Sequence, residues 1–122
     1  MALHTFKYPY TFPLELGGEL AGFQLAYTTH GKLNADGSNV LWVCHALTGS
    51  SDPTDWWDGL VGKDLHYDPK DWFIVCVNVL GSHYGSTNAL SNNPKRESLI
   101  IKLFLTFRSE TILMPLSCYE KN

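Results

Sequence analysis

Two nearly continuous apolar runs dominate the hydrophobic pattern of the chain. The first covers Val40 to Cys44, and the second covers Trp72 to Val79. Runs of this kind are typical of strands that are buried on both faces of a parallel sheet, whereas half-exposed strands alternate. Residues 45–71, which separate the runs, are numerous enough for the crossover connection that parallel strands require. The pattern therefore predicts two buried parallel strands.

Two further strands are predicted before this pair. Residues 5–12 are rich in Thr, Tyr and Phe and contain one Pro, which suits an edge strand. Residues 23–29 alternate roughly between apolar and polar positions and also favour a strand. Turn-forming residues follow each of them, at Gly17-Gly18 and at 34–39. An antiparallel start that leads into buried parallel strands is the opening of many α/β sheets.

A short helix is expected inside the crossover. Asp55 to Val61 is suited to start it, with Asp52 or Thr54 as the N-cap. Trp56 and Trp57 are adjacent in this segment. We expect one of these rings to pack in the core and the other to lie half exposed.

Composition narrows the class of protein. With 122 residues, 44% of them apolar and 17% charged, we expect one globular domain. The net charge of -3 argues against a nucleic-acid binder, and no apolar run is long enough to span a bilayer. The N-terminus lacks the pattern of a secretory signal, and Cys44, Cys76 and Cys118 are too widely spaced for a disulfide framework. These features predict a cytoplasmic protein without nucleic-acid or membrane partners.

Two loops follow the predicted parallel strands, where ligands bind in open α/β sheets. In the first, His45 to Ser51, small residues and free backbone N–H groups could hold a developing oxyanion. On the pattern alone, an ordinary strand-to-helix turn is the favoured interpretation. The second loop, Asn78 to Thr87, contains two glycines and several hydroxyl residues that could line a pocket, although a surface loop is favoured there.

Motifs of several other enzyme classes are absent from the sequence. There is no G-x-S-x-G nucleophile elbow, no phosphate-binding glycine loop and no C-x-x-C pair. The histidines show no metal-ligand spacing, so neither a metal site nor a bound cofactor is predicted. They are His4, His30, His45, His66 and His83.

Four segments, in order, resemble the homoserine O-acetyltransferase family. Residues 25–34 are similar to the family pattern LAYETYGxLN, and residues 43–50 to VCHALTGS. Residues 56–62 are similar to WWDGLVG, and residues 78–87 to NVLGSxYGST. Four linked segments are far more specific than any one of them, and together they cover roughly residues 20–94.

The resemblance implies an α/β-hydrolase fold, of which this chain would hold an incomplete N-terminal part. It implies acetyl transfer from acetyl-CoA to the hydroxyl of L-homoserine, in methionine biosynthesis. Acetyl-CoA is here a substrate, and a full-length member is compatible with a homodimer. The family uses a Ser-His-Asp triad in which the Ser takes up the acetyl group before homoserine collects it.

Carried over to this sequence, the resemblance makes Leu47 the donor of an oxyanion N–H, with Thr48 and Gly49 shaping the same loop. No catalytic residue is assigned, because the family's triad lies beyond the matched region. The next stretch varies among relatives with the acyl group that they accept, and here it does not decide between acetyl and succinyl. It consists of Ser50, Ser51, Asp52 and Pro53.

The end of the chain departs from the family. After Lys95, relatives continue with a segment similar to Thr-Gly-x-Pro-Tyr, whereas this chain has Arg-Glu-Ser-Leu-Ile-Ile. Loss of one base from a run of A after Lys95 would convert codons for Thr-Gly-Glu-Pro-Tyr-Tyr into codons for the observed residues. We therefore expect residues 1–95 to be the N-terminal part of an acyltransferase domain. Residues 96–122 are an atypical tail, frameshifted or divergent, whose apolar part at 99–107 fits a helix or a strand.

Three interpretations of function stay open. The chain is a homoserine O-acetyltransferase fragment that is inactive alone, because it carries no triad. Alternatively, it derives from a homoserine or serine O-succinyltransferase of the same fold, which acyl-CoA donor assays would distinguish. The third interpretation is a non-catalytic vestigial or interaction protein.

Overall fold

The computed structural model describes residues 1–14, 17–93 and 98–99. The expected tail at 96–122, including the apolar stretch 99–107 and Cys118, lies outside the described residues except for Ser98 and Leu99. The chain divides into two compact units. Unit 1 contains Met1–Thr5 and Ala26–Asn78, and unit 2 contains Phe6–Leu25 and Val79–Asn122.

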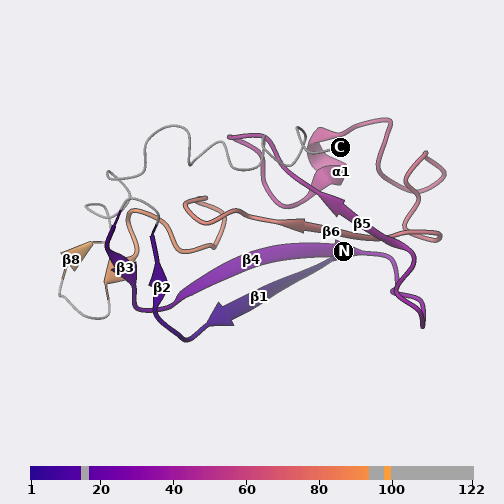
Figure 1. The fold of residues 1–122 in the computed structure, drawn as a ribbon. Helices are drawn as coiled ribbons and strands as arrows, with labels where there is room; N and C mark the ends of the chain where they lie inside the picture. Colours follow the sequence, from indigo (N-terminus) through magenta and orange to yellow (C-terminus); the bar gives the residue numbers. More distant parts are fainter. Residues whose placement is uncertain (15–16, 94–97, 100–122) are drawn as a thin grey trace. The chain divides into compact units, whose positions relative to one another are not determined.

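A four-stranded sheet has the strand order β1-β4-β6-β5 (Figure 1). The strands are Ala2–Tyr8 (β1), Phe23–His30 (β4), Val40–Val43 (β5) and Phe73–Val77 (β6). β4 pairs with β6 in the antiparallel direction, and β5 pairs with β6 in the parallel direction. The predicted order, an antiparallel start followed by a parallel pair, is therefore confirmed.

The strand predicted at residues 5–12 is wrong in its bounds. β1 ends at Tyr8, and the separate two-residue strand β2 begins at Phe12. Pro9 separates the two, and its ring fixes φ and removes the N–H that would continue the pairing. β2 (Phe12–Pro13) pairs in the antiparallel direction with β3 (Glu19–Leu20) within unit 2.

The prediction that both parallel strands are buried on both faces holds for β6 only. The three central residues of β6 are buried, whereas Trp42 and Val40 of β5 are 61% and 43% exposed. β5 is the last strand in the sheet order, so among the described residues it has a neighbour on one side only. Its Val43 is buried, in the same apolar cluster as Ile74 and Cys76 of β6.

The helix in the crossover is shorter and begins earlier than the predicted one. α1 covers Pro53–Trp56, with Asp52 as its N-cap and Pro53 at the start of its first turn. Asp52 was one of the two caps expected, and Pro is favoured at the first helical position because its missing N–H would be unpaired there. The segment after Trp56 forms turns instead of the predicted helix to Val61.

Each unit has its own apolar core. In unit 1, Val43, Val61, Ile74 and Cys76 form a buried cluster against which both tryptophans of the crossover pack. Trp56 and Trp57 stack with ring centroids 5.5 Å apart, and both are half buried, so the expected split between a core ring and an exposed ring is wrong. In unit 2, Leu14 and Leu20 are buried with Phe23 and Leu80 packed against them.

The remaining described strands are β7 (Asn92–Asn93) and β8 (Ser98–Leu99), which pair in the antiparallel direction. In the described part of the chain, we find no helix with the length and apolar character needed to cross a membrane.

A buried carboxylate closes the turn that leads into β6. Asp68, which is 6% exposed, accepts hydrogen bonds from the N–H of Lys70 at 2.8 Å and from the N–H of Asp64 at 2.6 Å. Asp64 has a positive φ of 60°, a conformation that Asp tolerates better than most residues. These two N–H groups lower the pKa of the Asp68 carboxyl, because they stabilise its ionised form.

The stability of the chain should therefore depend on pH through Asp68. A carboxyl whose pKa is lowered by folding stabilises the fold above its unfolded pKa, and this contribution is lost as the pH falls through the folded pKa. We expect Asp68→Asn to lower the thermal midpoint near neutral pH, with the difference from the unmodified chain shrinking as the pH falls below about 5. The exposed Asp58→Asn is the matched control. An Asp68→Asn difference that stays constant over this range would contradict the linkage.

Candidate oxyanion turn and the polar network behind it

A tight turn follows β5, at the position of the predicted oxyanion loop. The N–H of Gly49 donates to the carbonyl of Ala46 at 2.8 Å, which places Leu47 and Thr48 at the centre of the turn. The Leu47 side chain is 73% exposed. No described residue accepts a hydrogen bond from the Leu47 N–H. The first central N–H of such a turn is not used by the turn's own hydrogen bond, so it is available to a ligand.

His45 and Gly49 both lie against the Ala46 carbonyl on which this turn closes. His45 is 3% exposed, and its Nδ1 lies 2.7 Å from the carbonyl oxygen of Ala46. Because a carbonyl oxygen only accepts, this contact requires the hydrogen on Nδ1. A Cβ on Gly49 would lie 3.2 Å from both the Ala46 oxygen and the His45 Cβ. A larger residue than Gly at position 49 would therefore push against the turn.

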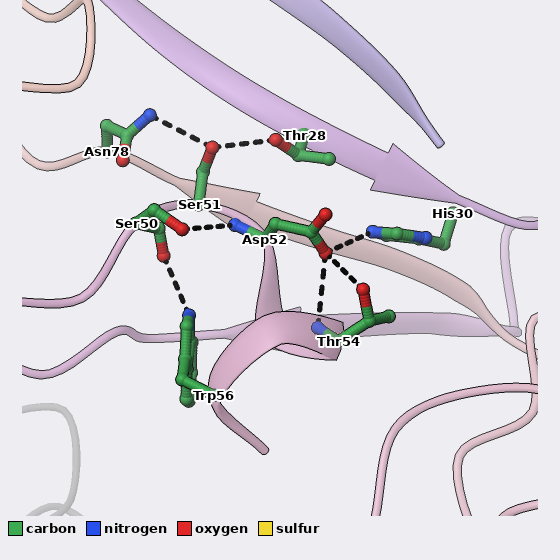
Figure 2. Close-up of polar contacts among 8 residues, drawn as sticks. All are labelled: Thr28, His30, Ser50, Ser51, Asp52, Thr54, Trp56 and Asn78. Carbon is green, nitrogen blue, oxygen red and sulfur yellow. Dashed lines mark hydrogen bonds and ion pairs between the residues drawn. The ribbon is translucent and has the colours of Figure 1, made fainter. Parts of the chain in front are cut away.

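The next residue but one, Ser51, lies at the centre of a buried hydrogen-bond group (Figure 2). Its Oγ lies 2.6 Å from Oγ1 of Thr28 on β4 and accepts a hydrogen bond from Nδ2 of Asn78 at 2.9 Å. Asn78 follows β6 directly, and its N–H donates to the carbonyl of Ala26 on β4. Ser51 thus joins the crossover to β4 and to the end of β6.

Asp52 forms a second junction beside the first. Its Oδ1 accepts from the N–H of Thr54 at 3.1 Å and from the hydroxyl of Thr54 at 2.7 Å, which caps α1. The same Oδ1 lies 3.1 Å from Nε2 of His30, a buried residue at the end of β4 (Figure 2). The contact is an ion pair when the imidazole is protonated.

Both the hydroxyl and the carbonyl oxygen of Ser50 accept hydrogen bonds. Its Oγ accepts a hydrogen bond from the N–H of Asp52 at 3.3 Å, and its carbonyl accepts from Nε1 of Trp56 at 3.0 Å. The segment after the turn is therefore fixed to α1 as well as to β4.

Cys76 lies in β6 and in the core cluster of unit 1. Burial, and to a smaller extent the nearby Cys44 and Asp52, raise the pKa of its thiol to about 12. A thiol with this pKa stays protonated at neutral pH and is a poor nucleophile. Cys76 therefore acts as a core residue, as its apolar surroundings in the sequence predict.

The predicted site residues fall into two groups in the structure. Leu47, Thr48 and Gly49 lie together in the turn, as the loop prediction requires. Of the predicted acyl-selectivity stretch, Ser51 and Pro53 are buried, whereas Ser50 and Asp52 are partly exposed. The roles assigned to both groups stay predictions.

Sequence reasoning missed the partners of this stretch. Thr28, His30 and Asn78 are buried polar residues, at 3%, 7% and 1% exposure. Thr28 and His30 are two residues apart on β4, so they face the same side of the strand, and this alternation is visible in the sequence. The sequence does not show that they pair with residues 51 and 52, because this pairing depends on how the crossover folds back onto β4.

The second predicted loop, Asn78 to Thr87, is closed by its own contacts in unit 2 from Val79 onward. The N–H of Gly81 donates to the carbonyl of Thr87 at 2.8 Å, and the N–H of Thr87 donates to the carbonyl of Gln24 at 2.9 Å. His83 and Tyr84 are exposed. Within the residues that the structure describes, no three His, Cys, Asp or Glu side chains are grouped to hold a metal ion.

Comparison with known proteins finds that the chain is similar to several homoserine O-acetyltransferases. No family model matches the chain. A homoserine O-acetyltransferase of Cyclobacterium marinum is 58% identical over 81 residues, which cover 66% of this chain and 23% of that protein. One of Chlorobaculum parvum is 55% identical over 91 residues, which cover 75% of this chain and 26% of that protein. The chain thus spans about a quarter of the length of the curated relatives that it matches.

A solved structure agrees with these relatives. The crystal structure of homoserine O-acetyltransferase from Bacillus anthracis matches with a TM-score of 0.65 and 27% identity. The match covers 82% of this chain and 31% of that one. The fold is therefore the N-terminal part of an α/β-hydrolase fold, as the resemblance implied.

Proposed function

Because this chain belongs to the homoserine O-acetyltransferase family and matches about a quarter of the length of its members, we propose that it supplies the N-terminal part of such an acyltransferase. The reaction is transfer of an acetyl group from acetyl-CoA to the hydroxyl of L-homoserine. The observation that carries the proposal is the exposed Ala46–Gly49 turn that follows β5, inside a segment similar to that family. Within the described residues, the Leu47 N–H of this turn has no acceptor.

The turn suits the chemistry of acyl transfer. Attack on a thioester or ester carbonyl produces a tetrahedral intermediate with a negatively charged oxygen, and a fixed N–H donor stabilises that charge. We assign this donor to Leu47, with Thr48 and Gly49 setting the shape of the turn. No described residue is assigned as nucleophile, acid or base, so the part of the reaction assigned to this chain is stabilisation of the oxyanion.

The remaining assignments follow from the same proposal. We assign residues 1–95 to the acyltransferase part of the chain and residues 96–122 to an atypical tail, frameshifted or divergent. The substrates are small molecules, and the spacing of the cysteines favours a cytoplasmic location.

A chimera tests the proposed function directly. The 81 residues of this chain that align with the Cyclobacterium marinum relative replace their counterparts in it, and release of CoA is measured with L-homoserine and acetyl-CoA. Because 58% of the aligned residues are identical, we expect kcat/KM within about tenfold of that enzyme, a change of about 1.4 kcal/mol in the barrier. Succinyl-CoA in place of acetyl-CoA tests the acyl preference. A folded chimera that transfers neither group would refute the proposal.

A further inference from the structure

The proposed reaction leaves a group of buried polar residues unused. Thr28, His30, Ser51 and Asn78 are almost fully buried, and Asp52 is partly so. Burying polar side chains is costly unless they are hydrogen bonded, and an apolar core would be simpler to build. Their contacts converge on Ser51 and Asp52, which follow the Ala46–Gly49 turn after one intervening residue.

The turn is thereby held at both of its ends. On one side, β5 and the buried His45 precede it. On the other side, Ser51 and Asp52 are joined to β4, while the turn's centre at Leu47 and Thr48 is exposed. The position of the Leu47 N–H relative to the sheet is therefore set by these two anchors.

The Ser51 anchor depends on a single hydroxyl. The amide nitrogen of Asn78 only donates, so Oγ of Ser51 accepts from it and shares its remaining hydrogen bond with Thr28. Without this hydroxyl, Asn78 Nδ2 and Thr28 Oγ1 would both lose the contact while staying buried.

The Asp52 anchor depends on His30. Nε2 of His30 is buried and forms no hydrogen bond within the described residues, but Oδ1 of Asp52 lies 3.1 Å from it, a contact that becomes an ion pair when the imidazole is protonated. Asp52 also caps α1, so the contact ties the end of β4 to the start of the helix. A movement of Asp52 would move Ser50 with it, because the N–H of Asp52 donates to Oγ of Ser50.

We propose that His30, Ser51 and Asp52 are positioning residues that hold the oxyanion turn in place from behind, without touching the substrate. The catalytic half of this proposal, that the position of the turn affects acyl transfer, rests on the proposed function. The structural half, that these residues hold the turn in place, does not. A consequence is that the predicted acyl-selectivity stretch acts at Ser51 through the position of the turn and not through contact with the acyl group.

The structural half is tested on the full chain by amide hydrogen exchange at Gly49, whose N–H closes the turn. We expect Ser51→Ala to raise this exchange rate about tenfold, the effect of losing about one buried hydrogen bond. His30→Ala should also raise it, because it removes the close contact with Asp52. Exchange at Ile74 in β6 reports whether the sheet itself is loosened. His30→Gln keeps an N–H donor near Asp52 and should restore slow exchange at Gly49. Ser38→Ala, an exposed serine in another turn, is the matched control.

The catalytic half is tested with the same variants in the chimera. We expect kcat to fall about tenfold with KM for both substrates unchanged, and His30→Gln to recover most of kcat. If an alanine variant fails to fold, Asp52→Asn replaces it, because Asn is an equally good N-cap but lacks the charge that faces His30.

The outcomes separate this inference from the proposed function. Unchanged Gly49 exchange in both alanine variants overturns the positioning role, even if the chimera is active. Faster exchange at Gly49 with unchanged kcat overturns the link between the turn and the reaction. An inactive parent chimera refutes the proposed function, and Gly49 exchange then still decides whether these residues hold the turn.

Discussion

Replacing Gly31 by alanine is expected to abolish or severely weaken folding of the chain. Gly31 follows β4 directly and has a φ of 79°, a conformation that costs a residue with a Cβ about 1–2 kcal/mol. A Cβ built there would also overlap the carbonyl oxygens of Trp72 and Pro69. Both are main-chain atoms at the entry to β6, so they cannot rotate away.

The overlap adds to the cost of the unfavourable φ. Overpacking a well-packed site costs about 1–3 kcal/mol. Here the backbone that leads into β6, at Pro69 and Trp72, would have to move. The combined loss is a large part of the about 5–15 kcal/mol that stabilises a typical domain. We therefore expect Gly31→Ala to be insoluble or to unfold at much lower urea concentration, as measured by tryptophan fluorescence.

Gly37→Ala is the matched control for this substitution. Its φ is 69°, and no heavy atom lies within 4 Å of the position that a Cβ would occupy. It should therefore pay only the conformational cost of about 1–2 kcal/mol. Equal losses of stability in the two variants would show that the close approach at Gly31 is unimportant.

The elements that were predicted well are those that local pattern determines. The apolar run at Phe73–Val77 and the alternating run at Phe23–His30 became β6 and β4, and Asp52 became a helix N-cap. A side chain that accepts a hydrogen bond two residues ahead acts within its own segment, so its role is visible in the sequence.

The elements that were mispredicted depend on neighbours that the sequence does not name. An apolar run predicts burial, but Trp42 is exposed because β5 is the last described strand of the sheet. Likewise, nothing near Ser51 in the sequence indicates that its hydroxyl meets Thr28 and Asn78, at sequence separations of 23 and 27 residues. The turn proposed to bind the oxyanion was singled out by family resemblance, since the local pattern favoured an ordinary turn.

Leu47→Pro in the chimera is expected to lower kcat about 100- to 1000-fold, the usual effect of deleting one oxyanion donor. Proline has no N–H, so the substitution removes the proposed donor itself. Leu47 occupies the first central position of the Ala46–Gly49 turn, where Pro is favoured, so the turn should persist. The loss should appear in kcat and kcat/KM together, because the donor acts on charge that develops in the transition state.

Leu47→Ala isolates the contribution of the N–H from that of the side chain. It removes most of an exposed side chain but keeps the backbone donor, so the ratio of kcat between the alanine and proline variants measures the donor alone. Thermal unfolding of both variants checks that neither substitution has disrupted the fold. If the two variants have similar kcat, the oxyanion is stabilised elsewhere. The exposed turn after β5 would then be an ordinary connection, as its local sequence pattern favours.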